Sequence, residues 1–256
     1  MSVHRCLYFS LTLVMIAAWT THSSASIVTG QTVGFDFGSI APAANPTQTF
    51  NQIDLFNNSL ANGATFTFLT DPNLNGGATS TQLVDFTNTA VTGVGFTITN
   101  STGQNTSRAN VTNGTAGPAP FNNSTVFQDS LISNNQGVAP LATGGFFTLT
   151  FSGLDDSIEY DLTGGYDGNN ANFDSILSAD GQTQRFAPGA NNYVTLSGLQ
   201  TDGSGNLAIT VTRDTLHANI GALTLTGAAA IAVPEPSSFA LLGVGFVGLL
   251  TRRRRS

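Results

Sequence analysis

The amino-acid sequence predicts an all-β fold, an antiparallel β-sandwich or jelly roll, for the central region of residues 26–227. Short segments of alternating apolar and polar residues recur there, and clusters of Gly, Asn, Asp and Pro separate them. No stretch of the region has the 3.6-residue periodicity of an amphipathic helix. About two hundred residues can bury roughly 70% of the unfolded surface, so one core without disulfides is expected.

The expected strands have one apolar face and one polar face. In Phe147–Phe151 the apolar residues share one face, while Thr148 and Thr150 occupy the other. This pattern is typical of an antiparallel sheet with one solvated face, where threonine is favoured. The same pattern, read along the chain, places strands at Thr32–Phe37, Thr65–Leu69, Gly95–Thr99, Phe146–Phe151, Ile158–Leu162, Tyr193–Leu196, Leu207–Thr212 and Ala222–Thr226.

Turn and loop signals separate these strands. Asp180-Gly181 and Asp202-Gly203 can supply the positive φ angles that tight turns require. Residues from about 100 to 125 are rich in Asn, Thr, Gly and Pro. We therefore expect a long polar loop in that segment.

The N-terminus has the composition of a secretory signal peptide, residues 1–25. Arg5 precedes an apolar segment, Leu7–Ala18, and small residues end in Ala25. We expect cleavage after Ala25, and therefore export of the chain.

The C-terminus predicts a single transmembrane helix after a short linker, residues 228–232. Residues 239–250 are all apolar or glycine, and Arg252, Arg253, Arg254 and Arg255 follow. Each arginine costs roughly 2.5–3.5 kcal/mol at a bilayer centre, so the cluster acts as a stop-transfer signal. Pro234 and Pro236 keep the preceding segment out of the helix.

These C-terminal elements resemble a known sorting signal. Val233-Pro234-Glu235-Pro236, the short apolar helix and the arginine cluster are similar to the PEP-CTERM signal of Gram-negative bacteria, over residues 233–256. The resemblance implies transient anchoring in the inner membrane and cleavage near the motif by an exosortase, a membrane-embedded protease. It further implies transfer to the cell envelope or extracellular space, in association with exopolysaccharide matrix.

Composition excludes several function classes for the segment between the two signals. It contains no Cys and no Lys, and its three arginines face fourteen acidic residues, a formal charge of −11. Thiol chemistry and disulfides are therefore absent. Binding to nucleic acid is excluded because a phosphate backbone would be repelled. No cofactor is expected, apart from the calcium candidate described below.

Catalytic signals in the segment are few, and we expect no catalytic residues and no enzyme. Asp214-x-x-His217, with Ser130, resembles part of the catalytic set of GDSL-type hydrolases, but Gln128 replaces the usual leading glycine. Glu159 and Asp161 share one strand face and could form an acid/base pair, although a solvated surface is the preferred interpretation. A secreted ester or glycoside hydrolase is the second alternative function.

One loop contains candidate metal ligands. Asp167, Asn169 and Asp174 offer the hard oxygen atoms that calcium prefers, although their spacing does not fit an EF-hand. An ordinary Asn/Gly turn is the alternative interpretation of this loop. Calcium is therefore a candidate cofactor.

The C-terminal half of the region, residues 145–227, is similar to galactose-binding-like carbohydrate-binding β-sandwiches. The likeness lies in Phe147–Leu154, Tyr160–Leu162 and Ala218–Leu225. Because this likeness is one of strand pattern and not of a binding motif, it implies a similar fold but no particular ligand. The sequence thus predicts an exported surface or matrix protein with a structural or adhesive role. A carbohydrate-binding module that binds extracellular polysaccharide is the alternative.

Overall fold

The protein is described by a computed structural model. The described residues are 26–37, 49–53, 65–68, 83–100, 105–110, 121, 129–134, 146–166, 174–187, 192–214 and 217–230. Every regular element in these residues is a β-strand, which confirms the predicted all-β class.

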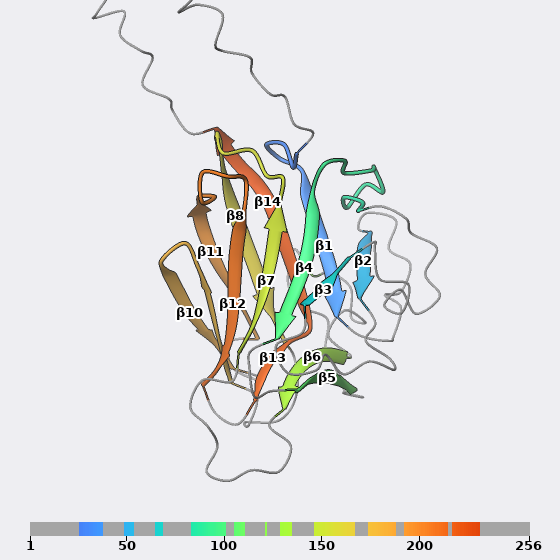
Figure 1. The fold of residues 1–256 in the computed structure, drawn as a ribbon, viewed down its shortest axis with the longest axis vertical. Coiled ribbons are helices and arrows are strands. Elements are labelled where there is room, and N and C mark those ends of the chain that lie inside the picture. The colour runs from blue at the N-terminus through green and yellow to red at the C-terminus, as the bar shows by residue number, and fades with distance from the viewer. Residues whose placement is uncertain are drawn as a thin grey trace, which may run out of the picture.

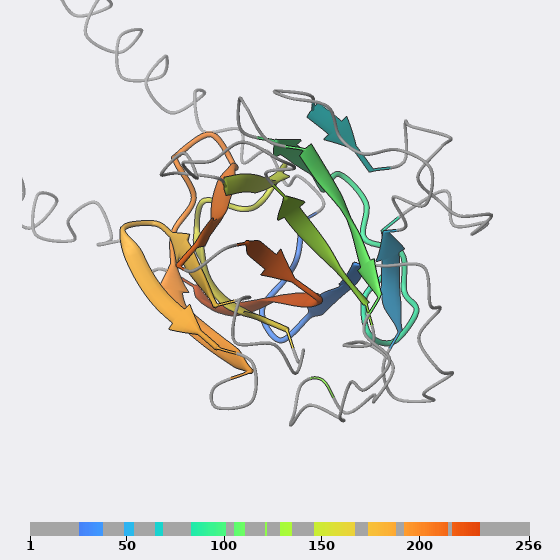
Figure 2. The same ribbon diagram turned by 90° about the horizontal axis from the view of Figure 1, so that it is seen from below.

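Two large sheets pack face to face, and a small third sheet lies across one end (Figures 1 and 2). The five-stranded sheet has the order β11 (Tyr193–Leu199), β8 (Ile158–Gly165), β14 (Ala222–Ala230), β1 (Thr32–Phe37), β2 (Phe50–Ile53). The six-stranded sheet has the order β10 (Gln182–Phe186), β9 (Ser175–Ala179), β12 (Leu207–Arg213), β7 (Phe146–Ser152), β4 (Gly95–Asn100), β3 (Thr65–Thr67). The third sheet has the order β13 (Ala218–Ile220), β6 (Asp129–Asn134), β5 (Asn105–Asn110).

Neighbouring strands are antiparallel throughout, except that β1 and β2 are parallel. The third sheet is an addition to the two layers that the sequence predicts.

Phenylalanine rings join the two large sheets across the core. Phe35 of β1 stacks on Phe96 of β4, with ring centroids 4.2 Å apart. Phe151 of β7 contacts both rings edge-on, at 5.5 Å from Phe35 and 5.0 Å from Phe96. All three side chains are fully buried. Burial of rings this large, in offset and edge-on contacts, is a main source of the stability of such a core.

The outer face of the six-stranded sheet carries threonine, as the alternation in the sequence predicts. Along β4, Phe96 and Ile98 are buried, whereas Thr97 and Thr99 are half-buried on the other face. Thr99 lies opposite Thr65 of β3 and Thr148 of β7. Hydroxyl groups on this face remain hydrated, and their β-branched stems favour the extended backbone.

Most predicted strands are confirmed, with ends shifted by a few residues. Leu69, the last residue of one predicted strand, lies outside the described residues. The Asp180-Gly181 turn is confirmed, with φ angles of 45° and 73°, and it joins β9 to β10. Gly203 also has a positive φ, of 79°.

The strand β5 lies inside the segment expected to form a long polar loop at about 100–125. It pairs with β6 through its backbone, from Asn105 to Asn110. Backbone pairing does not require an apolar side-chain pattern. The polar composition of this segment therefore gave no sequence signal for a strand. The strands β2, β6, β9, β10 and β13 were likewise not predicted as separate elements.

Both targeting segments lie outside the described residues. This holds for the predicted signal peptide with Ala25, for Val233–Pro236 and for Arg252–Arg255. In the part of the chain that is described, no helix has the length and apolar character needed to cross a bilayer.

We expect Phe96→Ala to lower the free energy of unfolding of the secreted domain by about 3–5 kcal/mol, because it leaves a cavity between the two sheets. The matched variant Thr97→Ala, on the wet face of the same strand, should cost about 1 kcal/mol or less. Urea denaturation followed by near-UV circular dichroism measures both. Equal costs would contradict the assignment of the two faces.

Candidate functional site at the end that carries both chain ends

Both ends of the described chain lie at the same end of the sandwich, at the top of Figure 1. The Ser26 hydroxyl is 3.5 Å from the Tyr160 hydroxyl of β8. Ala230, the last residue of β14, lies opposite Ile158, the first residue of β8. The segments that precede Ser26 and follow Ala230 therefore both attach near the start of β8.

The N-terminal segment is fastened to β14. Ile27 is fully buried in the main core. The Gly30 amide donates to the Gly227 carbonyl at 2.7 Å, and the Gly227 amide donates to the Gln31 carbonyl at 3.0 Å. A Cβ atom at Gly227 would lie 2.4 Å from the Val28 carbonyl oxygen, so only glycine permits this close approach.

A loop after β3 lies beside β1 at this end. The Phe86 amide donates to the Thr32 carbonyl at 2.9 Å. Asn51 of β2 donates to the Gly34 and Val84 carbonyls and accepts a bond from the Val84 amide. Gly34 leaves room for Phe86, because a Cβ atom there would lie 2.4 Å from the ring. The loop is thus held by backbone and amide hydrogen bonds.

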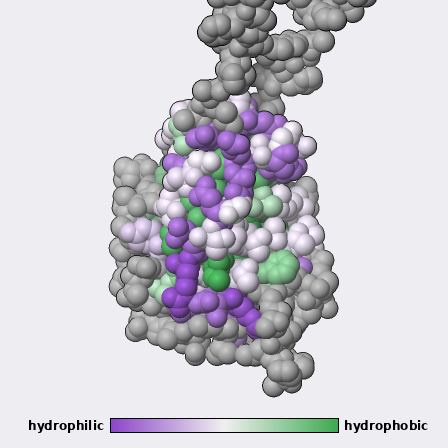
Figure 3. Space-filling model, turned by 90° about the vertical axis from the view of Figure 1, so that its left-hand side faces the viewer, coloured by the Kyte–Doolittle hydropathy of each residue, from purple (hydrophilic) through white to green (hydrophobic). Residues whose placement is uncertain are grey.

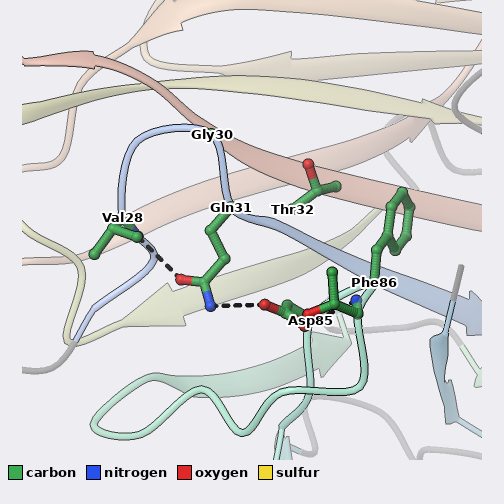
Figure 4. Close-up of a pocket in the computed structure, with 7 residues that line it drawn as sticks. Val28, Gly30, Gln31, Thr32, Asp85 and Phe86 are labelled. Carbon is green, nitrogen blue, oxygen red and sulfur yellow. Dashed lines mark hydrogen bonds between the residues drawn. The ribbon is translucent and has the colours of Figure 1, made fainter. Parts of the chain in front are cut away.

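Between this loop and the N-terminal turn lies an open pocket of about 390 Å³ (Figure 4). Its lining residues are Val28, Gly30, Gln31, Thr32, Asp85, Phe86 and Thr87. The Phe86 side chain is half-buried, whereas Val28 is 56% exposed. The pocket therefore offers apolar surface next to amide, hydroxyl and carboxylate groups.

The Asp85 carboxylate joins the two sides of this pocket through hydrogen bonds. One carboxylate oxygen accepts bonds from the amides of Thr87 and Thr89 and from the Thr87 hydroxyl, at 2.7–2.9 Å. The other accepts from the Gln31 side-chain amide at 3.0 Å, and Gln31 accepts from the Val28 amide. Burial alone would raise the pKa of Asp85, but the hydrogen bonds from Gln31, Thr87 and Thr89 together lower it below its ordinary value. With its oxygens engaged in this way, Asp85 positions the pocket wall rather than acting as a base.

Further carboxylates lie close to the two chain ends. Asp155 and Asp156 precede β8, and the Asp155 amide donates to the Tyr160 hydroxyl. Asp156 accepts bonds from the Gly205 amide, at 2.8 Å, and from the Thr201 hydroxyl in the turn that contains Asp202. Hydrogen bonds from Asn206 and Ser204 lower the pKa of Asp202.

The described arginines lie toward the other end of the sandwich. Arg213 ends β12, Arg185 lies near the end of β10, and Arg108 belongs to β5 of the small sheet. Hydrophilic and near-neutral residues cover most of the described surface over β10 and β11 (Figure 3).

The calcium candidate is only partly within the described residues. Asp167 and Asn169 lie outside them. Asp174 is nearly buried, and its carboxylate pairs with Arg185, which also pairs with Asp214. A calcium ion would have to compete with this guanidinium for Asp174. Among the described residues, no group of three or more His, Cys, Asp or Glu side chains could hold a metal ion. The calcium site stays a prediction.

The hydrolase candidates are not brought together. Ser130 lies on β6 and is 1% exposed. In the antiparallel register of β6 with β13, Ala218 is opposite Ser133, so that His217 comes opposite Asn134, four residues from Ser130. At ~3.3 Å per residue the two side chains are about 13 Å apart. The Asp214 carboxylate pairs with Arg185. Glu159 and Asp161 share one face as predicted, and Asp161 accepts a bond from the Gly198 amide.

The residues of the pocket were not found from the sequence. Gln31 and Asp85 are 54 positions apart, so no local pattern could pair them. The one local signal was Asp85 followed by Thr87 and Thr89, a composition typical of an aspartate-capped turn.

The comparisons with known proteins concern mainly the sorting segment. A family model described as the PEP-CTERM protein-sorting motif matches residues 232–255, which confirms the resemblance at the C-terminus. The match indicates export and processing by an exosortase toward the cell surface. No curated protein matches the chain.

Several solved structures are similar to the chain at low levels. A Bacillus subtilis protein has 15% identity and a TM-score of 0.39, covering 79% of this chain and 41% of its own. A family 35 carbohydrate binding module from Clostridium thermocellum has 16% identity and a TM-score of 0.28, covering 48% of this chain and 88% of its own. The enzymatically active domain of bacteriophage CBA120 tailspike protein 4 has 12% identity and a TM-score of 0.30, covering 53% of this chain and 18% of its own. The chain therefore spans less than half of the Bacillus subtilis structure, and similarities this low carry no argument about ligand or activity.

We expect Asp85→Ala to lower the free energy of unfolding by about 2 kcal/mol near pH 7, because four hydrogen-bond donors lose their acceptor. Since the folded pKa of Asp85 is lowered, its contribution is present above the ordinary aspartate pKa and is lost as the pH falls below about 4.

The control is Asp85→Asn, which keeps an acceptor oxygen but cannot titrate. It should destabilise the domain less than Asp85→Ala and should remove the same part of the acid dependence. Denaturant unfolding from pH 7 to pH 2.5 tests this, and an unchanged acid dependence in both variants would contradict the assigned role of Asp85.

Proposed function

We propose that the protein is an exported structural or adhesive component of the exopolysaccharide matrix, released from the inner membrane by an exosortase-like protease. The observation that carries this proposal is the sorting-motif match at residues 232–255, which begins two residues after the last strand of the domain. The predicted signal peptide, 1–25, would supply the route across the inner membrane.

The chemistry of the domain supports a non-enzymatic role. The candidate nucleophile Ser130 and the candidate base His217 are not brought together, since the register of β6 with β13 places them far apart. Asp85, the one carboxylate in the pocket, is held by four hydrogen bonds. A rigid sandwich without cysteine is suited to an extracellular setting, where its stability needs no redox partner.

We expect the secreted protein to begin at Ser26 and to end near Pro234–Pro236, as measured by intact-mass spectrometry of culture supernatant. Replacement of Pro234, Glu235 and Pro236 by alanine should leave the chain in the membrane fraction with its arginines attached. The matched control Ser237→Ala should be released normally. Recovery of a secreted form that still carries Arg252–Arg255 would overturn the processing proposal.

Carbohydrate binding at the pocket is the second candidate function. The half-buried Phe86 ring can pack on the apolar face of a sugar, while the Gln31 amide and the Thr87 hydroxyl lie beside it. Such a module would attach the protein to extracellular polysaccharide without any change in the proposed route of export.

Affinity electrophoresis in gels that contain the producing cell's own exopolysaccharide tests this candidate. Migration of the domain should be retarded, and Phe86→Ala should reduce the retardation by about tenfold or more, the loss expected for one central aromatic contact. Phe146→Ala, at an exposed ring on the other sheet, is the control and should migrate as the unmodified domain. Equal retardation of all three would exclude the pocket, and an unretarded domain would exclude binding to that polysaccharide.

A further inference from the structure

The pocket of Figure 4 combines a supported aromatic ring with a buried carboxylate. The centroid of the Phe86 ring lies 5.1 Å from that of Phe50, and the Phe86 ring packs over Gly34, where a Cβ atom would be 2.4 Å away. Asp85 is only 7% exposed, although it lines the pocket. Both groups are therefore held in place before a ligand binds, which reduces the entropy that binding loses.

The Asp85 carboxylate keeps hydrogen-bonding capacity at one oxygen. A carboxylate can accept about four hydrogen bonds, two at each oxygen. Oδ1 of Asp85 accepts three, from the amide and the hydroxyl of Thr87 and from the Thr89 amide. Oδ2 accepts one, from the side chain of Gln31. Oδ2 can therefore accept a further bond from a ligand.

Gln31 supplies a donor beside this oxygen. Its side-chain amide has two N–H groups and one carbonyl oxygen. One N–H donates to Asp85 at 3.0 Å, and the oxygen accepts from the Val28 amide at 3.1 Å, so the orientation of the side-chain amide is fixed. The second N–H remains for a ligand. The pocket thus presents a donor and an acceptor from two atoms 3.0 Å apart (Figure 4).

This donor–acceptor pair fits hydroxyl groups better than it fits ions. A hydroxyl both donates and accepts, so neighbouring hydroxyls of a sugar ring can bond to Asp85 and Gln31 together. A ligand carboxylate has no proton to donate, and Asp85, the only charged residue of the lining, would repel it. An ammonium group only donates, so it cannot accept a bond from the second N–H of Gln31.

We propose that the pocket binds uncharged sugars, with Asp85 and Gln31 bonded to hydroxyl groups and Phe86 against the ring, and that Asp85 rejects uronic acids. This inference rests on the second candidate function, carbohydrate binding at the pocket. It adds the class of sugar and the residue that selects it. Asp85 carries its charge at neutral pH, because its hydrogen bonds keep its pKa below the ordinary aspartate value.

The test uses one polysaccharide in three forms: galactomannan, galactomannan with its primary hydroxyls oxidised to carboxylates, and the methyl ester of the oxidised polymer. Isothermal titration calorimetry of the secreted protein at pH 7 gives a dissociation constant for each form. We expect the oxidised form to bind at least about tenfold more weakly than galactomannan, because two like charges meet in the pocket. Esterification removes the charge and should restore most of the affinity.

Two variants separate the charge in the pocket from the net charge of the protein. Asp85→Asn and Asp180→Asn each remove one negative charge, but Asp180 lies in the exposed turn between β9 and β10, outside the lining. Asparagine also suits the positive φ of 45° at residue 180. Asp85→Asn should reduce the affinity ratio of the neutral to the oxidised form to about threefold or less, whereas Asp180→Asn should keep it. Thermal unfolding checks that both variants are folded.

An affinity ratio that Asp85→Asn leaves unchanged, or that both variants reduce equally, would overturn the inference, because the selection would then come from elsewhere on the protein. Rejection of the ester as strongly as the acid would also overturn it, since size rather than charge would then decide.

Equal binding of all three forms would overturn the selection of uncharged sugars. If Phe86→Ala weakens that binding, carbohydrate binding at the pocket stands without the selection. Failure of unmodified galactomannan to bind would overturn the inference, and the exopolysaccharide gels would then decide the second candidate function independently. None of these results bears on the proposed route of export.

Discussion

The two-sided pairing of β14 is the interaction on which the rest of the molecule depends. Its Leu223 and Leu225 side chains are fully buried between the two large sheets, and its backbone joins β8 to β1. Gly227, near its end, receives the N-terminal segment at a distance that excludes a Cβ atom. The strand that completes the core is therefore also the strand that leads to the sorting segment. The chain continues from this strand to the segment that matches the sorting motif, residues 232–255.

Sequence reasoning found the strands whose burial alternates. The buried and half-buried positions of β4, β7 and β12 repeat every second residue, which is the pattern that apolar and threonine residues encode. It missed β10, whose three central residues, Thr183, Gln184 and Arg185, are all exposed at a sheet edge. It also missed β5 in a polar segment. Both strands form because a neighbouring strand supplies backbone hydrogen bonds. This pairing does not depend on a particular side-chain pattern, so the sequence of the strand does not predict it.

The functional features divide in the same way. The sorting motif was found because its elements are adjacent in sequence and each has a local physical meaning: proline, an apolar segment, arginine. The pocket was not found, because it forms where Gln31, from the N-terminal turn, reaches Asp85 in a distant loop. Ser130 and His217, the residues of the hydrolase alternative, were adjacent to suggestive motifs, but their separation is fixed by a strand register that no short motif specifies. Contacts between residues far apart in the sequence can be predicted only when the fold is known.

Ser26 and Ala230 both lie beside the start of β8, so the two ends of the folded domain are close together in space. A few residues could join these two ends covalently without crossing the sandwich. The chain could then be opened between β12 and β13, near the small sheet, with the pairing of every described strand preserved. A circular permutant of this kind would carry its new ends beside the small sheet, at the end of the sandwich opposite to Ser26 and Ala230 (Figure 1).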